Sequence, residues 1–251
     1  MASNKEHKQH HIELGYGESA PTVLMPQNIE AVKLFAGLMD EAKQIAHWRE
    51  YLSFLGTKDG VAIGCTSSGI GPSPTAIGIE ELINIGSKNV IRIGTCGSIQ
   101  EHVKAGDVVI VTGAVRGERA TEEFIPVDYP AVADYRIIRA AIDACEKLGL
   151  KYHIGIVRTH DAYYLESAYS DGDVKARMQQ WIDLGVLGVD TETATMLVRA
   201  SMEGVRAGAV LLSSDPIFEG PKADKDSDEY QKKMMMLGIE MAKNLHEKGL
   251  D

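Results

Sequence analysis

Short apolar runs rich in β-branched residues alternate along this chain with longer stretches in which apolar residues recur every three or four positions. The first pattern is typical of strands, and the second is typical of helices that bury one face. Several runs are apolar at every position, as expected for strands covered by helices on both sides. The alternation predicts an α/β fold with three layers, in which helices cover both faces of a central, mostly parallel or mixed β-sheet.

The individual elements can be placed from the same pattern. Strands are expected at residues 23–25, 61–66, 90–94, 108–111, 154–157, 186–189 and 209–212. Amphipathic helices are expected at residues 75–85, 134–148, 192–202 and 230–245. No repeat or low-complexity linker divides the 251 residues, so a single domain is expected over residues 1–251. The polar segment at residues 219–229 is interpreted as either a solvated loop or a lid over a binding site.

Charge and cysteine content limit the possible partners and compartments. The formal net charge of -10 at pH 7 disfavours binding to nucleic acids and to anionic membranes. Cys65, Cys96 and Cys145 are too few and too scattered for a disulfide framework, which favours a reducing compartment. The N-terminal residues lack the apolar core of a signal peptide, and no apolar run reaches membrane-spanning length. A soluble, cytoplasmic protein is therefore expected.

Residues 91–98 carry the strongest chemical signal. Arg92 interrupts an apolar strand, and a Gly-bounded turn with Thr95 and Ser98 is expected to follow it. Arginine is rarely buried unless its charge meets a partner. A guanidinium, hydroxyl groups and exposed backbone N–H groups at the end of a strand are the donors that an oxyanion needs. The alternative is an arginine that only pairs with an acidic surface residue.

Carboxylates follow two other expected strands. Asp190 and Glu192 flank Thr191 at a strand-to-helix junction, where Glu192 could accept the protons of two sugar hydroxyls or simply complement the helix N-terminus. Ser214 and Asp215 end an apolar strand. Asp215 could act as a general acid if burial raised its pKa, or it could only open a turn.

Three further segments are less specific. The Gly-rich turn at residues 67–72 fits neither the phosphate-binding Gly-Lys-Ser/Thr loop nor the dinucleotide-binding glycine pattern, so it is either a tight connection or a ligand contact. Tyr163 and Tyr164 follow a strand and could stack on a planar base or only pack. The histidines near the N-terminus lack other ligands, so no metal site is expected.

Taken in their order along nearly the whole chain, these segments resemble the nucleoside phosphorylase-I family, which includes uridine phosphorylases and hexameric bacterial-type purine nucleoside phosphorylases. No single segment is decisive, and the specificity resides in the ordered set. The matching segments are residues 11–12, 23–26, 47–51, 68–71, 80–82, 92–97, 106–107, 130–134, 161–164 and 190–192.

The resemblance implies a phosphorylase-like fold and phosphorolysis, in which phosphate attacks the anomeric carbon of a nucleoside while the glycosidic bond breaks. The residues that it assigns are Arg49, Arg92 and Thr95 for phosphate, His11, Thr191 and Glu192 for ribose, and Tyr163, Cys96, Gly97 and Ser214 for the base, with Asp215 and Arg92 in catalysis. Arg49 and His11 would reach the neighbouring subunit's site. A homo-oligomer built from dimers, with a hexamer as the family's usual state, is therefore implied. Phosphate is the co-substrate, and no cofactor is expected.

The chain departs from the family pattern at several positions. Gln27 and Ala31 replace a glycine and a phosphate-binding arginine, which removes a contact worth about 1.5–3 kcal/mol. The residues that read uracil are missing from positions 165–169, and only Lys222 and Lys225 stand near Asp215 in place of an arginine. A hydrolytic nucleosidase and a weakened nucleoside-binding relative therefore remain alternatives, and the base stays open between purine and pyrimidine.

Overall fold

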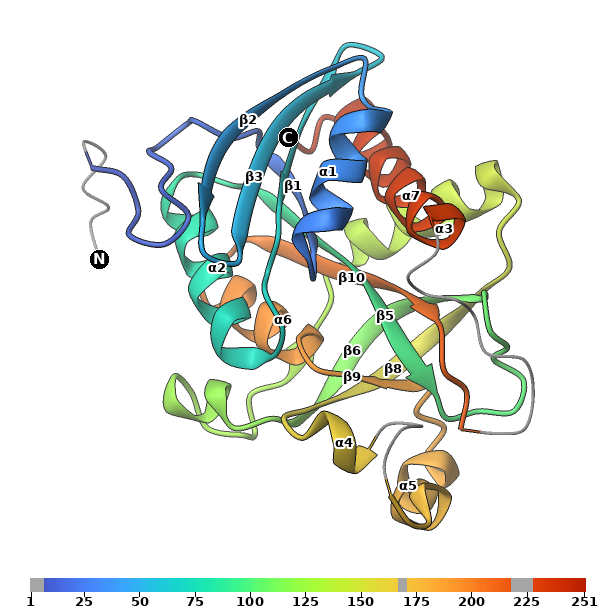
Figure 1. Cartoon of the computed structure of the whole chain (residues 1–251). Helices are drawn as coiled ribbons and strands as arrows, with labels where there is room; N and C mark the ends of the chain where they lie inside the picture. The colour runs from blue at the N-terminus through green and yellow to red at the C-terminus, as the bar shows by residue number, and fades with distance from the viewer. Residues whose placement is uncertain (1–6, 167–170, 218–227) are drawn as a thin grey trace.

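The computed structural model describes residues 7–166, 171–217 and 228–251, which form a ten-stranded mixed sheet with helices on both faces (Figure 1). The strands are β1 (Thr22–Pro26), β2 (Glu41–Trp48), β3 (Tyr51–Lys58), β4 (Val61–Thr66), β5 (Asn89–Ser98), β6 (Val108–Gly117), β7 (Ala131–Val132), β8 (Tyr152–His160), β9 (Gly188–Asp190) and β10 (Arg206–Ser213). The helices are α1 (Ile29–Leu38), α2 (Pro72–Asn84), α3 (Tyr135–Leu148), α4 (Tyr163–Glu166), α5 (Val174–Asp183), α6 (Thr193–Met202) and α7 (Asp228–Glu247), with a short 3-10 helix at Ala120–Glu123. The predicted fold class is confirmed.

The order of the strands brings several carboxyl ends together. The sheet runs β10-β6-β8-β9-β5-β1-β4-β3-β2, with β7 beside β6, and β10 also pairs with β5. The strands β5, β9, β8, β6 and β10 therefore close into a ring, from which β1, β4, β3 and β2 extend. Because β1 and β10 both run parallel to β5, these strands end at the same edge of the sheet. Such an edge is where α/β proteins place their ligands.

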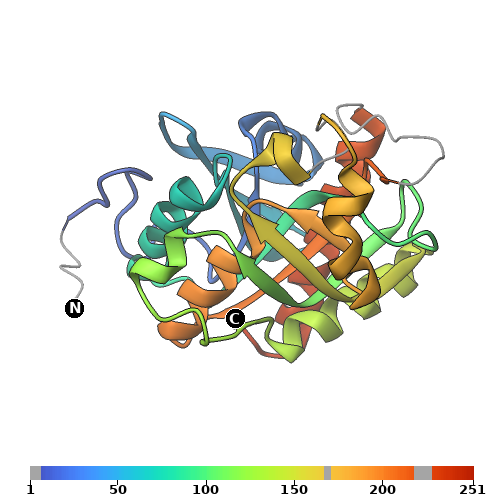
Figure 2. The same ribbon diagram turned by 90° about the horizontal axis from the view of Figure 1, so that it is seen from below.

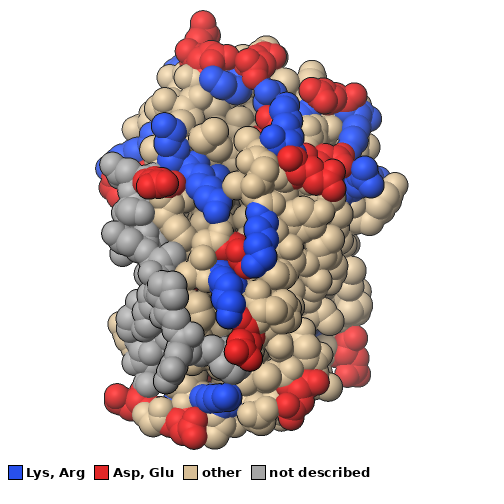
Figure 3. Space-filling model, turned by 90° about the vertical axis from the view of Figure 1, so that its right-hand side faces the viewer, with Lys and Arg blue, Asp and Glu red and all other residues tan. Residues whose placement is uncertain are grey.

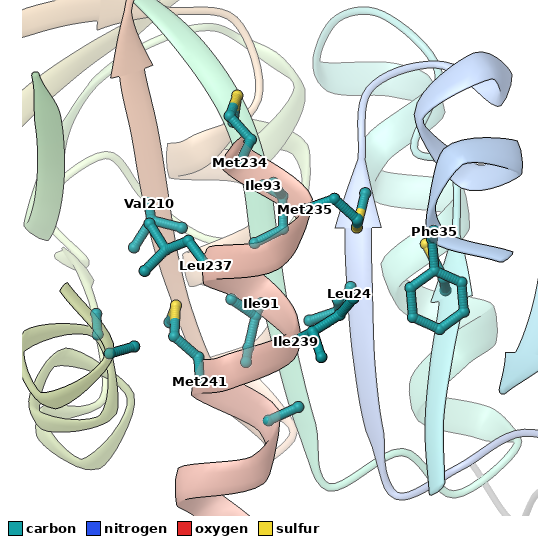
Figure 4. Close-up of a cluster of buried hydrophobic side chains, with 14 of the residues drawn as sticks. Leu24, Phe35, Ile91, Ile93, Val210, Met234, Met235, Leu237, Ile239 and Met241 are labelled. Carbon is teal, nitrogen blue, oxygen red and sulfur yellow. The ribbon is translucent and has the colours of Figure 1, made fainter. Parts of the chain in front are cut away.

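Two apolar clusters lie on opposite faces of the sheet, and alternate residues of β1 contribute to each. Leu24 belongs to the cluster under α1, α3 and α7, whereas Val23 and Met25 belong to the cluster under α2 and α6. Figure 4 shows Leu237 of α7 directed toward β10, and Ile239 of the same helix directed toward Leu24. This two-sided burial explains why the central strands are apolar at nearly every position.

The predicted helices correspond to α2, α3, α6 and α7, and each predicted strand is present within a few residues of its expected place. Local chemistry sets some of the ends. The Asp134 side chain accepts a hydrogen bond from the Arg136 N–H and begins α3, which ends at Gly149 in the left-handed conformation. The sequence pattern did not predict α1, β2 or β3.

The prediction that the strand containing Arg92 ends at residue 94, before a Gly-bounded turn, is wrong. β5 continues to Ser98, because Thr95 and Cys96 pair with β10 and Gly97 pairs with Val189 of β9. The Ser98 hydroxyl is fully buried and donates to the Val103 carbonyl, so it supplies no donor to a ligand.

The described residues show neither a membrane-spanning helix nor a continuous basic surface on the face in Figure 3. No described helix is long and apolar enough to cross a bilayer. On the face in Figure 3, Lys and Arg stand among Asp and Glu, so the described residues there form no continuous basic surface. Residues 218–227, which include most of the polar segment interpreted as a loop or lid and both Lys222 and Lys225, lie outside the described residues, as do residues 167–170.

Candidate active site

A cavity of about 380 Å³ opens where β1, β5 and β10 end. Most of the predicted site residues line it. They are Arg92, Thr95, Cys96, Gly97, Tyr163, Thr191, Glu192, Ser214 and Asp215. The cavity therefore collects residues from segments that are more than a hundred positions apart in the sequence.

Arg92 is the central cation of this cavity and is only 3% exposed. Its Nε donates to Asp190 Oδ2 at 3.1 Å, and its Nη2 donates to Glu192 Oε2. Its Nη1 is buried and has no hydrogen-bond partner among the described residues. A Cβ atom at Gly94 would lie 2.8 Å from the Arg92 guanidinium, so glycine is needed there for the arginine to keep this position.

Glu192 is held by donors from three parts of the chain. Its Oε1 accepts hydrogen bonds from the Gly71 N–H at 2.7 Å, from Thr191 Oγ1 at 2.6 Å and from Gln27 Nε2 at 3.2 Å. The Gly-rich turn of residues 67–72, which had two possible interpretations, thus binds Glu192 through Gly71, and its Ile70 lines the cavity. These bonds fix the carboxylate without using it to cap α6.

One interpretation of the carboxylates of Asp190 and Glu192 was that they complement a helix N-terminus. Asp190 has this role at the start of α6. Its Oδ2 accepts from the Thr193 N–H at 3.0 Å and from Thr193 Oγ1 at 2.5 Å. Its Oδ1 accepts from Thr159 Oγ1 at 2.7 Å. Asp190 therefore fixes the start of α6 and orients Arg92, while Glu192 faces the cavity.

Ser214 and Asp215 lie beside the end of β5. The Ser214 N–H donates to the Cys96 carbonyl at 3.0 Å, and its hydroxyl donates to Asp215 Oδ2 at 2.7 Å. Both residues are buried. Burial also raises the pKa of the Cys96 thiol, with a further contribution from Asp190, so this cysteine stays protonated and is a poor nucleophile at neutral pH.

Two predicted site residues, His11 and Arg49, do not line the cavity of their own chain. The His11 ring contacts Glu81 Oε1 at 2.8 Å, and Glu81 also accepts from the His11 and Ile12 N–H groups. Arg49 is exposed at the turn between β2 and β3, with a φ of 52°. Their expected contribution to a neighbouring subunit stays a prediction.

Several lining residues were not assigned to the site from the sequence: Gln27, Asn28, His160 and Gln231. Gln27 lines both the main cavity and a second one of about 20 Å³, which Ala31 also lines. The space beside the position where the family has its arginine is therefore small. His160 ends β8 but lies three residues beyond the strand expected at residues 154–157, so the sequence pattern did not mark it. Gln231 lies on an expected helix and was not marked either.

The fold and this cavity define an α/β protein that binds a small anion-bearing or polyhydroxy ligand at the carboxyl ends of its strands. The chain belongs to the phosphorylase superfamily, whose family model matches residues 22–247.

Characterised relatives and solved structures agree with this assignment. A uridine phosphorylase from Thermococcus kodakarensis is 39% identical over 212 residues, which cover 82% of this chain and 76% of the relative. A guanosine phosphorylase from Halorubrum lacusprofundi is 32% identical over 223 residues, covering 88% and 89%. The crystal structure of a uridine phosphorylase from Vibrio fischeri superimposes with a TM-score of 0.83 at 29% identity, covering 96% of this chain and 98% of that one.

Proposed function

We propose that this protein is a nucleoside phosphorylase, which cleaves the N-glycosidic bond with inorganic phosphate and releases a free base and a sugar 1-phosphate. The main support for this proposal is Arg92, which lines the cavity and whose buried Nη1 makes no hydrogen bond to any described residue. A buried N–H group of a cation is costly when it makes no hydrogen bond. An oxyanion bound beside Thr95 would satisfy it.

The proposed mechanism relies on position and charge. Phosphate would bind Arg92 and Thr95, and the sugar hydroxyls would donate to Glu192. The nucleophile would then lie below the anomeric carbon, and the negative charges of phosphate and Glu192 would stabilise the positive charge that develops on the sugar. The base would leave between Tyr163 and the Ser214–Asp215 pair, where a hydrogen bond or a proton would stabilise it.

The test is a comparison of base release with and without phosphate. Uridine, inosine, guanosine and adenosine are incubated separately with the protein, and the free base is quantified by chromatography. We expect release from at least one nucleoside to require phosphate. Equal release without phosphate would establish hydrolysis instead, and binding without any release would establish a non-catalytic relative.

We further propose that the active form is a cytoplasmic homo-oligomer built from dimers, which needs no metal or organic cofactor. Supporting this, β2 is an edge strand and is largely exposed, and Arg49 follows it at the exposed turn. An exposed strand edge is normally covered in a stable protein. In the described parts of the chain, no group of three His, Cys, Asp or Glu side chains is arranged to hold a metal ion.

Mixing variants tests the dimer. Arg49→Ala and Thr95→Val should each impair phosphate binding when every subunit carries the change. A hybrid dimer contains one chain of each variant. If Arg49 completes the neighbour's site, a hybrid of the two variants has one intact site and recovers activity after subunits exchange. Unchanged activity on mixing, with exchange shown by mass spectrometry, would contradict the cross-subunit role.

A further inference from the structure

His160 is the one histidine that lines the active-site cavity in the described part of the chain. It ends β8, and its side chain is 4% exposed. Its Nδ1 atom is buried and makes no hydrogen bond to a described residue. A histidine that lines a cavity and has a ring nitrogen without a hydrogen bond to the described residues can bind a ligand there.

An anchored ion pair lies next to the ring. Arg158 lies two residues earlier on β8, so its side chain is on the same face of the strand as His160. Arg158 donates two hydrogen bonds of 2.9 Å to Glu166 of α4, and its guanidinium stacks 4.6 Å from the centre of the Trp181 ring of α5. In Figure 2, α4 and α5 lie side by side over this end of the sheet. Glu166 Oε2 lies 3.8 Å from His160 Nδ1.

A glycine on the neighbouring strand leaves room for the Arg158 side chain. Gly117 of β6 pairs with His160 across the sheet. A Cβ atom at Gly117 would lie 2.1 Å from Arg158 Nη1, so only glycine leaves room for the arginine. The arginine, the carboxylate and the aromatic ring therefore form a preformed support rather than a chance surface contact.

The charged groups around the imidazole set its protonation. Burial lowers the pKa of His160, and the charge of Arg158 acts in the same direction. The nearby carboxylates of Glu166 and Asp190 and a hydrogen bond with the Ala162 backbone act in the opposite direction. The pKa stays below the ordinary value, so the ring is neutral at pH 7. A neutral imidazole offers one N–H donor and one nitrogen acceptor.

We propose that His160 recognises the base of the nucleoside through a hydrogen bond from its ring, and that Arg158, Glu166 and Trp181 position that ring. The inference rests on the proposed function and adds a specificity residue to it. His160 stands three residues before Tyr163, which the proposed function assigns to the base, and both residues line the cavity. The substrate class is a nucleoside whose base turns a carbonyl oxygen or a ring N–H group toward the imidazole.

Calorimetric binding of free bases tests the proposal without requiring turnover. Uracil, hypoxanthine and adenine are titrated into the full-length protein and into His160→Ala, His160→Asn and the control His246→Ala, whose ring lies at the far end of α7. We expect His160→Ala to lower the affinity for the most tightly bound of these bases by about tenfold to a hundredfold. The base loses a hydrogen bond, and one of its polar atoms is left unpaired. His160→Asn should restore part of this loss, and phosphate binding should not change.

The outcomes separate the inference from the proposed function. Unchanged base binding in His160→Ala, equal losses of base and phosphate binding, or no base binding by the unmodified protein would each overturn the role of His160. Base release that needs no phosphate would overturn the proposed function instead. In that case, a loss of base binding alone in His160→Ala would still support the role of His160.

A second variant tests the positioning role. Glu166→Gln keeps the shape of the side chain but removes its charge, so the pKa of His160 should fall further, which NMR titration of the histidine resonances can follow. We expect the KM for the nucleoside to rise by about threefold or more with a smaller change in kcat. An unchanged His160 titration together with an unchanged KM would remove Glu166 from this role.

Discussion

At the scale of single residues, Arg92 serves both the fold and the proposed anion site. Two of its nitrogens donate to Asp190 and Glu192, and the third has no hydrogen-bond partner within residues 7–166, 171–217 and 228–251. Removing the arginine would leave both carboxylates buried without a counterion, which typically costs about 3–5 kcal/mol. A loss of activity in Arg92→Ala would therefore mix a phosphate defect with unfolding, and a neighbouring donor is a cleaner probe.

Thr95 provides that probe. Thr95→Val keeps the shape of a half-buried strand residue and removes only its hydroxyl, so we expect the KM for phosphate to rise about tenfold or more, because a hydrogen bond to a charged group is lost. The nucleoside KM should change little. Thr112→Val, on β6 and outside the active-site cavity, is the matched control for initial-rate measurements. An unchanged phosphate KM in Thr95→Val would exclude the hydroxyl from the anion site.

Asp215 is the residue whose role depends on the base. If it supplies a proton or hydrogen bond to a departing purine, Asp215→Asn should slow the cleavage of inosine or guanosine about a hundredfold, while uridine is less affected. Single-turnover rates on both classes of nucleoside measure this difference. Equal slowing of both classes, or none, would argue against the role of Asp215 as a general acid.

At the scale of secondary-structure elements, close packing of α3 on the sheet sets the position of β10. A Cβ atom at Gly208 would lie 2.4 Å from Ile137 Cγ2, although Gly208 is not in a left-handed conformation. The helix can approach the strand only because that atom is absent. β10 carries Ser214 and Asp215 at its end, so this contact links core packing to the geometry of the site.

The same substitution should have opposite effects at two glycines. Gly208→Ala should destabilise the protein by about 1–3 kcal/mol through overpacking. Gly37→Ala, on the exposed side of α1 with no atom within 4 Å of the new methyl group, should stabilise it by about 0.5–1 kcal/mol through helix propensity. Urea denaturation measures both values. Equal stability of the two variants would contradict the packing argument.

Burial determined which elements could be predicted. Central strands such as β1 and β10 are covered on both faces, so their apolar runs stand out in the sequence. β2 is exposed along most of its length and carries charged and polar residues, so no apolar pattern marks it as a strand. The extension of β5 through Thr95–Ser98 depends on pairing with β9 and β10, which local sequence does not reveal.

The site was predictable to a similar extent. Arg92 is a charged residue within an apolar strand, and Glu192 and Asp215 lie two residues after the ends of β9 and β10, so the sequence marks them as unusual. The contacts of Gln27 and Gly71 with Glu192 come from distant segments, and only the fold brings them together. The distinct roles of Asp190 and Glu192 also depend on side-chain directions that the sequence leaves open.

At the scale of the whole molecule, ion pairs on several elements make stability depend on pH. Hydrogen bonds from Lys58 and Lys248 lower the pKa values of Asp40 and Asp143. For Asp107, burial alone would raise the pKa, but hydrogen bonds from Lys151 and His153 bring it below the ordinary value. A carboxyl group with a lowered pKa in the folded state stabilises the protein above its unfolded pKa, and this stabilisation is lost as the pH falls.

We therefore expect the thermal unfolding midpoint to fall as the pH drops below about 4, the ordinary pKa of an aspartate in the unfolded chain. Asp107→Asn should be less stable at pH 7 and should lose less stability on acidification, because the titrating group is gone. Thermal scans between neutral and acidic pH measure both effects. Parallel pH profiles for the two proteins would contradict the contribution of Asp107.

The proposed reaction requires that phosphate, rather than water, attack the anomeric carbon of the sugar. Phosphorus-31 NMR of the full-length protein with phosphate and the nucleoside that it cleaves tests this directly. We predict a sugar 1-phosphate signal that grows in step with the released base. Base release with only the inorganic phosphate signal present throughout would contradict the account.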